Sequence, residues 1–444
     1  MGRFFNHLYN IFAFTTFTKQ KAYYLETKIG VIGLGYVGLP LARLFSTKYP
    51  TLGCDTNLAR IDSIMSGRDE TGEVDDALLQ SAIANGFKCY RDFNRLLDCN
   101  IYIVAVPTPV DSNNTPDLTA LLEASRSVGR IISKGDVVIF ESTVYPGVTE
   151  EECVPIIEQT SGLKYNVDFF AGYSPERINP GDKTHTVEKI KKVTSGSTPE
   201  IADRIDALYN SVLENGTYKA SSIKIAEASK ILENSQRDVN IAFMNELAKI
   251  FNAMDVDTRE VIEAASTKWN FLKFTPGLVG GHCISVDPYY LIQRAQVYGV
   301  FPRVMSAARR LNESMGDYVA HEVIKLMNKK GILVKDARIL LLGIAFKEDC
   351  PDIRNTKVAD IYDALLEYTS RITVYDPHAD AAEVKRRYNI TLAPELPSGP
   401  YDAIILAVAH KEFSTLNLPA LKAPTSIIYD VKSFLPKDIV DGRL

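Results

Sequence analysis

The sequence predicts an α/β protein in which two doubly wound domains are joined by a long central helix. From Lys28 to about residue 215, short apolar runs alternate with helical patterns, as is typical of a parallel sheet covered by helices. Residues 222–254 then contain no glycine or proline and follow the pattern of one long helix. A second alternation of apolar runs and helical patterns begins near Lys335 and indicates a smaller domain of the same class.

The first domain is expected to span residues 28–215. An apolar run from Lys28 leads into a glycine-rich turn, and further buried strands are expected at 101–106 and 137–141. Because helical patterns separate the strands, we expect the strands to run parallel. The helices are expected at residues 58–66, 76–85 and 118–132. Residues 1–27 are set apart as an N-terminal extension of unknown role.

The long helix is expected to link domains or to carry a dimer interface. About 30 residues at a rise of 1.5 Å form a rod of about 45 Å, which is longer than most helices of globular proteins. Residues 216–325 are therefore assigned to a central helical and dimerisation region. Residues 326–444 are assigned to a second, C-terminal α/β domain, with a helix expected at 358–368.

Composition narrows the class of protein. The chain has 444 residues, with 50 Lys and Arg against 55 Asp and Glu, and therefore a formal charge of −5. With 46% hydrophobic residues the chain can bury a core. Its slight net negative charge would not attract a polyanion such as nucleic acid. No apolar run approaches the roughly 18 residues of a membrane span. The six cysteines lie far apart without metal-ligand spacing, so we expect reduced thiols, no metal and a cytoplasmic location.

A glycine motif indicates a dinucleotide site. Residues 33–38 read Gly-Leu-Gly-Tyr-Val-Gly directly after a strand and at the start of a helix, and Asp55 follows Gly33 by 22 residues. Glycines let the backbone approach a pyrophosphate, the helix N-terminus attracts its charge, and the acid accepts hydrogen bonds from a ribose. Because the acid favours an unphosphorylated ribose, the pattern predicts a Rossmann-like domain that binds NAD rather than NADP.

Three loops follow expected strands or lie near them. Residues 106–109 read Val-Pro-Thr-Pro, residues 142–144 read Ser-Thr-Val, and residues 174–181 read Ser-Pro-Glu-Arg-Ile-Asn-Pro-Gly. Ligands of open α/β sheets collect at the carboxyl ends of the strands, so the first two loops are candidates for binding. The alternative is that their threonines only cap the loops.

The strongest local signal is residues 275–288, which read TPGLVGGHCISVDP. Glycines would let a substrate approach Cys283 closely, and Asp287 follows four residues later. A free cysteine is more often a small buried hydrophobe than a nucleophile, and we expect this of the other five. His282 is adjacent in sequence, but neighbours need not face each other, so we do not assign it as a base.

On the long helix, Glu227, Lys230 and Asn234 share one face, because they are three and four residues apart. One interpretation is a solvated stripe with an ion pair. The other is that Lys230 is catalytic, which requires a partner such as Cys283.

Taken in order, several segments resemble motifs of the UDP-glucose/GDP-mannose dehydrogenase family, and the resemblance covers nearly everything from Lys28 onward. The cysteine motif and SPERINPGD are similar to the branch that oxidises UDP-N-acetylhexosamines, such as UDP-N-acetylglucosamine or UDP-N-acetylgalactosamine. The glucose branch usually has a lysine where this chain has Val286. Residues 355–357 read Asn-Thr-Lys where the family often has Glu-Ser-Pro. The segments that carry the resemblance are GLGYVGLPLA, VPTP, STV, SPERINPGD, the Lys-x-x-x-Asn helix, GGHCISVDP and AFKEDCPDIR.

The resemblance implies a four-electron oxidation of the C6 hydroxyl to a uronic acid, with two NAD consumed. A cysteine adds to the aldehyde, and loss of the second hydride leaves a thioester that water cleaves. The catalytic residues it implies are Cys283, Lys230, Asn234, Asp287, Glu176 and Thr143. The cofactor contacts it implies are Gly33, Gly35, Tyr36, Val37, Gly38, Asp55, Arg60, Thr108, Thr143 and Arg354. The substrate contacts it implies are Arg177, Lys230, Asn234, Arg237 and Lys347, with the uridine end on the C-terminal domain.

The resemblance further implies a homodimer or larger homo-oligomer that makes a uronic acid for a surface polysaccharide. Two alternatives stay open. The same chemistry could act on UDP-N-acetylmannosamine, UDP-glucose or GDP-mannose, or the chain could be a catalytically silent nucleotide-binding protein. Loss of Cys283 or Lys230 would have favoured the silent protein, but both residues are present.

Overall fold

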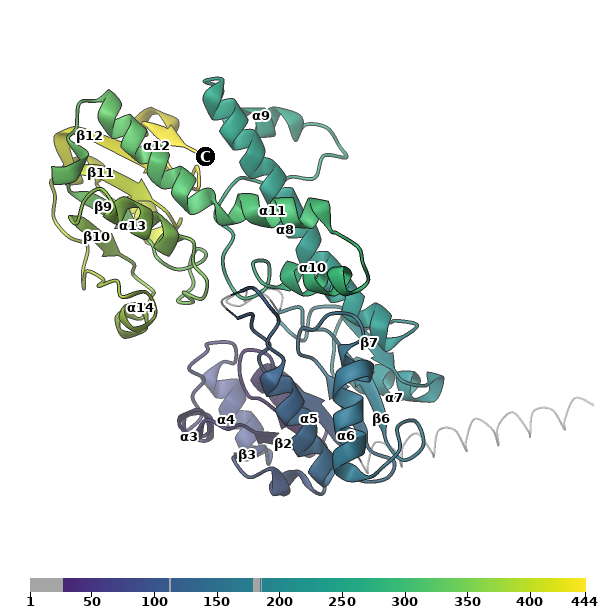
Figure 1. The fold of residues 1–444 in the computed structure, drawn as a ribbon. Coiled ribbons are helices and arrows are strands. Elements are labelled where there is room, and N and C mark those ends of the chain that lie inside the picture. The colour runs from purple at the N-terminus through teal and green to yellow at the C-terminus, as the bar shows by residue number, and fades with distance from the viewer. Residues whose placement is uncertain (1–26, 112, 179–183, 185) are drawn as a thin grey trace, which may run out of the picture. The chain divides into compact units, whose positions relative to one another are not determined.

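The computed structural model describes residues 27–444 except 112, 179–183 and 185 (Figure 1). All but the last residue of the predicted N-terminal extension, residues 1–27, lies outside the described residues. The chain forms two compact units, the first ending at Ile231 and the second beginning at Leu232. The boundary falls inside one helix, α8, so the predicted α/β fold of two doubly wound domains joined by a long central helix is confirmed.

Both units alternate strands and helices along the chain. The strands and helices of the first unit are β1 (Ile29–Ile32), α2 (Gly38–Ser46), β2 (Thr51–Cys54), α3 (Leu58–Met65), α4 (Asp76–Ala84), β3 (Lys88–Tyr90), β4 (Ile101–Val104), α5 (Thr119–Ile131), β5 (Val137–Phe140), α6 (Val154–Ser161), β6 (Phe170–Tyr173), β7 (Lys192–Gly196), α7 (Pro199–Asn210) and β8 (Thr217–Lys219). The linking helix is α8 (Ile223–Ala253). Those of the second unit are α9 (Thr258–Ala265), α10 (Asp287–Val297), α11 (Arg303–Glu313), α12 (Met315–Lys329), β9 (Ile339–Leu342), α13 (Val358–Leu366), β10 (Ile372–Tyr375), α14 (Ala381–Tyr388), β11 (Tyr401–Leu406), α15 (Leu418–Leu421), β12 (Lys422–Asp430) and β13 (Gly442–Arg443).

The first unit contains an eight-stranded sheet in the order β3-β2-β1-β4-β5-β6-β7-β8. The strand order reverses between β1 and β4, which creates the switch point where ligands of such sheets bind. The sheet departs from the prediction at one pair, because β7 runs antiparallel to β6. The described residues between these two strands contain no helix, and an antiparallel connection needs none.

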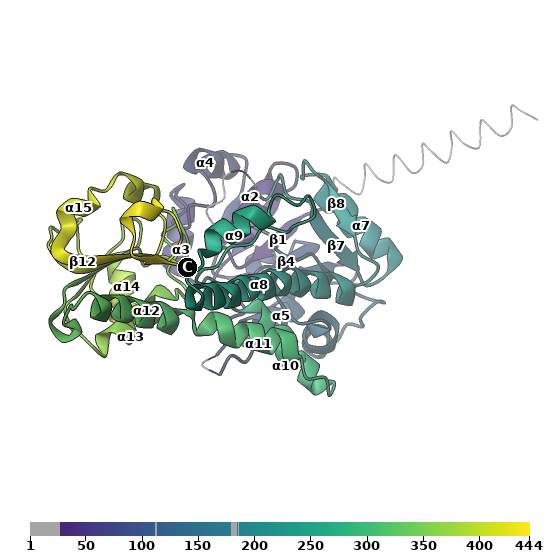
Figure 2. The ribbon, with the colours of Figure 1, turned by 90° about the horizontal axis from the view of Figure 1, so that it is seen from above.

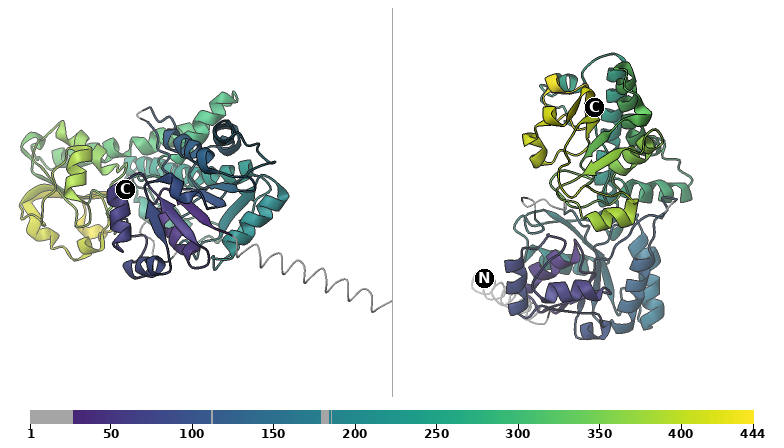
Figure 3. Two further views of the ribbon diagram at one scale, coloured as in Figure 1. Left: turned by 90° about the horizontal axis from the view of Figure 1, so that it is seen from below. Right: turned by 90° about the vertical axis from the view of Figure 1, so that its left-hand side faces the viewer.

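Helices cover both faces of this sheet, as the right-hand view of Figure 3 shows for the first unit. On one face, the side chains of Ile29 and Val31 pack in a core with residues of α2, α4 and α7. On the other face, Tyr102 and Phe140 pack in a core with residues of α5 and α6. The central strands β1, β4 and β5 are buried on both faces, which explains their continuous apolar sequences.

The second unit contains a five-stranded parallel sheet in the order β10-β9-β11-β12-β13. Alternate residues of β9 point to opposite faces: Ile339 and Leu341 join a core with α12 and α13, whereas Leu340 and Leu342 join a core that includes α15. Figure 2 shows α15 on one side of this sheet and α12 and α13 on the other.

Helix α8 has 31 residues and carries an exposed apolar stripe within the second unit. Three of its apolar side chains, Leu232, Phe243 and Ile250, are between 46% and 67% exposed, and Met254 directly after the helix is 63% exposed and continues the helical spacing. Within the part of the chain that the structure describes, no helix combines the length and the apolar character needed to cross a membrane.

The turn between β1 and α2 brings two backbone segments into contact. Gly33 has a φ of +85°, and a Cβ on this residue would lie 2.7 Å from the carbonyl oxygen of Ala105. A Cβ on Gly38, the first residue of α2, would lie 1.7 Å from the carbonyl oxygen of Gly33. The turn therefore closes only with glycine at both ends.

We expect Gly38→Ala to lower the melting temperature by roughly 4–10 °C, because an added methyl group must push backbone away from backbone. The matched control is Gly35→Ala in the same turn, where an added Cβ would meet nothing within 4 Å. Thermal unfolding of both variants followed by circular dichroism checks this expectation. Equal melting temperatures for the two variants would contradict the close approach.

Candidate active site

The first candidate site residue at the carboxyl edge of the first sheet is Asp55, directly after β2. Its Oδ2 accepts a hydrogen bond from the backbone N–H of Leu34 at 2.8 Å, so the acid is held beside the glycine turn. Arg60 lies beneath the same turn: its Nε donates to the carbonyl oxygen of Leu34 at 2.9 Å, and its Nη1 lies 2.7 Å from Asp69. Asp55 is half-buried, as are Gly33, Gly35, Tyr36 and Val37, so these predicted cofactor contacts share one accessible turn.

The second unit places an acid at the corresponding position, Asp376 after β10, but closes it off. Its Oδ2 accepts the N–H groups of Ile344 and Ala345 and faces Nε2 of buried His410 at 3.1 Å. Although burial opposes ionisation, the bond from His410 and the two backbone bonds hold the pKa of Asp376 well below its ordinary value. The hydrogen-bonding capacity of Asp376 is used by groups within the protein, so Asp55 is the better candidate to bind a ribose.

Three polar side chains of the second unit, Asp349, His378 and His410, bring potential ligand atoms within 4.8 Å of one another. His410 Nδ1 accepts the backbone N–H of Asp349 at 3.0 Å, so its proton lies on Nε2, which faces Asp376. Both nitrogens of the His410 imidazole are thereby engaged by the protein, so His410 has no lone pair left for a metal ion.

Hydrogen bonds between the ends of two neighbouring strands hold the predicted loops together. Thr108 Oγ1, after β4, donates to the carbonyl oxygen of Thr143, after β5, at 2.7 Å. Ser142 Oγ donates in the opposite direction to the carbonyl oxygen of Val106 at 2.7 Å. The two hydrogen bonds therefore hold the loops to each other, and Thr143 is half-buried at the same edge of the sheet as Asp55.

Glu176 lies on the loop after β6 and is 7% exposed. One carboxylate oxygen, Oε1, accepts the backbone N–H of Ile178, whereas the buried Oε2 has no hydrogen-bond partner among the described residues. A buried carboxylate oxygen without a donor is suited to hold a water molecule. Arg177 is exposed and donates to the carbonyl oxygen of Lys191 at 3.3 Å, and residues 179–181 of this motif lie outside the described residues.

The polar side chains predicted on one face of α8 are buried, so the interpretation as a solvated stripe is wrong. Glu227, Lys230 and Asn234 are 0%, 6% and 5% exposed. Glu227 accepts the backbone N–H groups of Gly147 and of Thr149, the latter at 2.9 Å. Burial raises the pKa of Glu227, and these two bonds oppose the rise.

The cysteine loop of the second unit is held by Asn245 on α8. The buried amide of Asn245 donates to the carbonyl oxygen of Gly277 at 3.0 Å and accepts the N–H of Gly277 at 2.8 Å. The same amide also donates to Asn312 Oδ1 on α11 at 2.8 Å. Six residues further along, the thiol of Cys283 is half-buried, whereas the other five cysteines are buried, as predicted.

The paired glycines of this loop pack against the segment that follows β9. A Cβ on Gly280 would lie 2.7 Å from the carbonyl oxygen of Asn355, and Gly281 has a φ of +84° and lies against the ring of Phe346. Asn355 itself has a φ of +51° and donates from Nδ2 to the carbonyl oxygen of Gly281 at 2.9 Å. Asn355, at a position where this chain departs from the family's usual residue, thus helps to hold the cysteine loop.

Asn234 and Asp287, predicted to act together, are neighbours in the second unit. Asn234 Nδ2 donates to Asp287 Oδ2 at 2.5 Å, and Asp287 is the first residue of α10. The backbone N–H of Asp287 donates to the carbonyl oxygen of Cys283 at 2.8 Å. The thiol-bearing turn, the acid and the amide are therefore joined through one chain of hydrogen bonds.

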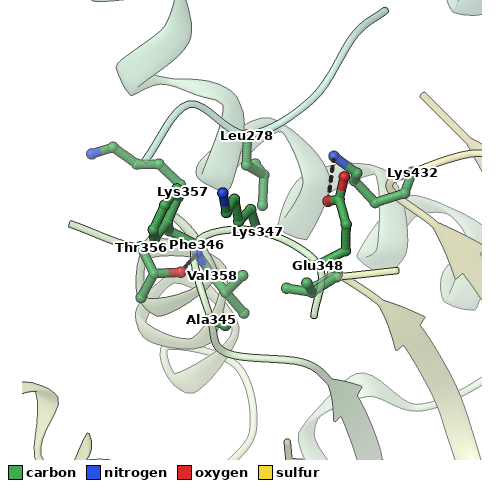
Figure 4. A pocket seen from close by; sticks show the side chains of 11 residues that line it. Leu278, Ala345, Phe346, Lys347, Glu348, Thr356, Lys357, Val358 and Lys432 are labelled. Carbon is green, nitrogen blue, oxygen red and sulfur yellow. Dashed lines mark hydrogen bonds and ion pairs between the residues drawn. The ribbon is translucent and has the colours of Figure 1, made fainter. Parts of the chain in front are cut away.

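A pocket after β9 is lined by Leu278, Phe346, Lys347 and Lys432 together with neighbouring residues (Figure 4). The ammonium of Lys432 lies 3.7 Å from a carboxylate oxygen of Glu348. Lys432 also lines a separate cavity of about 230 Å³, together with Arg259 and Lys273. Lysines and arginines beside hollows of this kind suit a ligand that carries phosphate.

Two further predicted contacts are engaged in local ion pairs. Arg354 binds Asp352 through Nε at 3.0 Å and Nη2 at 2.6 Å, and Arg237 binds Glu233 one turn earlier on α8 at 3.1 Å. Sequence reasoning missed Asn245 and Asn355. The available signal for Asn245 was its seven-residue spacing from Asp238, which places two buried polar side chains on one face of α8.

These features define a dehydrogenase that binds a dinucleotide and carries a thiol on a glycine-framed loop. Residues 27–213 match the NAD binding domain of the UDP-glucose/GDP-mannose dehydrogenase family, residues 224–314 its central domain, and residues 340–437 its UDP binding domain. The chain belongs to this family, and it is an NAD-dependent enzyme.

Named relatives agree with this assignment. The chain is 54% identical to the UDP-N-acetyl-D-glucosamine 6-dehydrogenase of Pseudomonas aeruginosa over 94% of this chain and 100% of that protein. It is 50% identical to the enzyme of the same name from Salmonella typhi, over 94% of this chain and 99% of that protein. The structure of a UDP-D-ManNAc dehydrogenase from Pyrococcus horikoshii matches with a TM-score of 0.86 and 30% identity, covering 94% and 98% of the two chains.

We expect Asn245→Ala to reduce the rate of NADH formation at least about tenfold and to lower the free energy of unfolding by about 1–3 kcal/mol, because it leaves Gly277 unpaired. The matched control is Asn240→Ala on the same helix, whose side chain donates to the carbonyl oxygen of Gln236 one turn away. Steady-state assays and urea unfolding of both variants check this. Equal rates for the two variants would show that Asn245 does not position the loop.

Proposed function

We propose that the enzyme oxidises the C6 hydroxyl of UDP-N-acetylglucosamine to the uronic acid, as a step toward a surface polysaccharide. The observation that carries this proposal is a half-buried Cys283 on a glycine-framed loop, in a chain 54% identical to a relative with that named substrate. UDP-N-acetylgalactosamine differs only in the orientation of the C4 hydroxyl and is the second candidate within this branch.

The chemistry needs a covalent intermediate. NAD accepts one hydride from C6 in each of two oxidations, and the glycine turn with Asp55 fits this cofactor. Between the two oxidations, the Cys283 thiolate adds to the aldehyde carbon and restores a carbon that bears both hydrogen and an oxyanion. After the second hydride leaves, the substrate is a thioester on Sγ, and water cleaves it to the carboxylate.

The remaining residues stabilise charge or move protons in this scheme. Lys230 stabilises or deprotonates the C6 oxygen, and the paired Asn234 and Asp287 hold this oxygen or a water molecule. Thr143 positions water, and Glu176 accepts its proton during thioester hydrolysis. The unpartnered Oε2 of Glu176 supports its assignment as the base.

The proposed domain roles follow the same division. Residues 28–215 bind NAD, residues 216–325 provide the dimer interface and the cysteine loop, and residues 326–444 bind the UDP moiety. The cofactor contacts proposed are Gly33, Gly35, Tyr36, Val37, Gly38, Asp55, Arg60, Thr108, Thr143 and Arg354. The substrate contacts proposed are Arg177, Lys230, Asn234, Arg237 and Lys347.

We also propose a homodimer in the cytoplasm. The exposed stripe of Leu232, Phe243 and Ile250 on α8, with Met254 directly after the helix, is an apolar surface of the kind that a second copy covers. A cytoplasmic location accords with six cysteines that form no disulfide among the described residues.

NADH formation against a panel of nucleotide sugars tests the reaction and its substrate. We expect two NADH per molecule of UDP-N-acetylglucosamine consumed, because the adduct on Cys283 retains the aldehyde from the first oxidation and carries it into the second. One NADH per sugar would mean that the aldehyde escapes. Preference for UDP-N-acetylmannosamine, UDP-glucose or GDP-mannose would overturn the substrate, and no turnover with any sugar would favour a silent binding protein. Cys283→Ala is the matched variant, and full uronate formation by it would exclude the thioester.

Phe243→Glu should convert the dimer to a monomer, because it places a charge in the centre of the exposed stripe. Size-exclusion chromatography with light scattering measures the mass directly. Glu246→Ala, an exposed position on the same helix, is the control that should remain dimeric. An unchanged dimer in Phe243→Glu would place the interface elsewhere.

A further inference from the structure

A buried cluster of charged and polar side chains lies next to Glu176 in the first unit. Its members come from separate elements: Lys192 begins β7, Glu141 follows β5, and Tyr209 lies on α7. All three are 0% exposed. The reaction scheme above does not use them, although burying an ammonium and a carboxylate is costly unless their contacts are good.

The ammonium of Lys192 connects the cluster to the Glu176 loop. Nζ donates to Glu141 Oε2 at 2.6 Å and to the carbonyl oxygen of Pro175 at 3.2 Å, and it lies 3.9 Å from Glu176 Oε2. The hydroxyl of Tyr209 donates to the other oxygen of Glu141. Lys192 therefore fixes the residue before Glu176 and lies within ion-pair distance of the very oxygen that has no hydrogen-bond partner.

One buried ammonium thus faces two carboxylates. With both acids ionised the cluster has a net charge of −1, and after one proton is taken up the net charge is zero. Burial raises the pKa of Glu141 to about 7, with Lys192 opposing the rise and Glu176 adding to it. Burial and Glu141 hold the pKa of Tyr209 well above its ordinary value, so its hydroxyl stays neutral. Arg177, the neighbouring cation on the loop, is exposed.

We propose that Lys192 and Glu141 are positioning residues that set the basicity of Glu176 during thioester hydrolysis. This inference rests on the role proposed above for Glu176. Lys192 holds the loop and stabilises ionised Glu176, whereas Glu141 competes for the same ammonium and so keeps Glu176 basic enough to accept a proton.

The hydrolytic step balances in this arrangement. The water oxygen bonds to the thioester carbon and one water proton passes to Glu176 Oε2. The C–S bond then breaks with its electron pair on Sγ of Cys283, and the new carboxylic acid releases its proton to solvent. While Glu176 is protonated, Lys192 and Glu141 form a one-to-one pair, so no buried charge is left without a partner.

Substitutions of Glu141 and of Lys192 should move the acid limb of the pH–rate profile of thioester hydrolysis in opposite directions. In Glu141→Gln the ammonium is left to Glu176 alone, which favours the ionised form of Glu176 and moves the limb at least about one pH unit lower. In Lys192→Met the two carboxylates repel each other, so the limb moves at least about one unit higher. The measurement is the decay rate of the mass adduct on Cys283, followed by quenched flow and intact-protein mass spectrometry between pH 5 and 9 with the full chain.

Opposite shifts support the inference, whereas parallel shifts, or a uniform loss of rate with no shift, overturn it. If Lys192→Met does not fold, the direction of the shift in Glu141→Gln decides. Lys219→Met, which removes an exposed pair with Asp203 in the same unit, is the matched control and should leave the pH profile unchanged.

Glu176→Gln separates the two proposals. An adduct that still decays at the normal rate overturns both, whereas an adduct that persists while Lys192→Met and Glu141→Gln behave normally overturns this inference alone.

Discussion

Parallel pairing of β1, β4, β5 and β6 is the constraint on which the first candidate site depends. Because these strands run in one direction, the segments that follow them meet at a single edge of the sheet. The glycine turn, Thr108, Thr143 and Glu176 all lie in these segments. A side chain placed after any of these strands therefore lies at the same edge of the sheet as the glycine turn.

In the second unit, the main constraint is that a flexible glycine-rich loop is held in one conformation. Glycines at 280 and 281 let the loop approach Phe346 and Asn355 closely, but they also increase the entropy lost on folding. The two hydrogen bonds between Asn245 and Gly277 and the bond from Asn355 to Gly281 offset that loss. The thiol of Cys283 is presented by a loop held at both ends.

Buried charges are consistently compensated in the regions around the candidate site. Glu227 accepts two backbone N–H groups, Asp376 accepts bonds from His410 and from backbone, and Glu141 pairs with Lys192. Oε2 of Glu176 differs in that it has no hydrogen-bond donor among the described residues, and the Lys192 ammonium lies 3.9 Å away. A proton acceptor benefits from such an oxygen, because a hydrogen bond donated to it would weaken its basicity.

The sequence by itself determined the fold class and the long helix, because both depend on local spacing of apolar residues, and it determined the glycine turn, because that turn depends on residues without a side chain. It also singled out Asn234 and Asp287, which the structure joins by a hydrogen bond. Only the tertiary structure decided that β7 turns antiparallel, that Lys230 and Glu227 are buried, and that Asp376 is closed off while Asp55 is accessible. The roles of Asn245 and of the cluster of Lys192 and Glu141 also became apparent only in the tertiary structure. These outcomes depend on which elements pack together, and contacts between residues far apart in the chain leave no periodic pattern in its sequence.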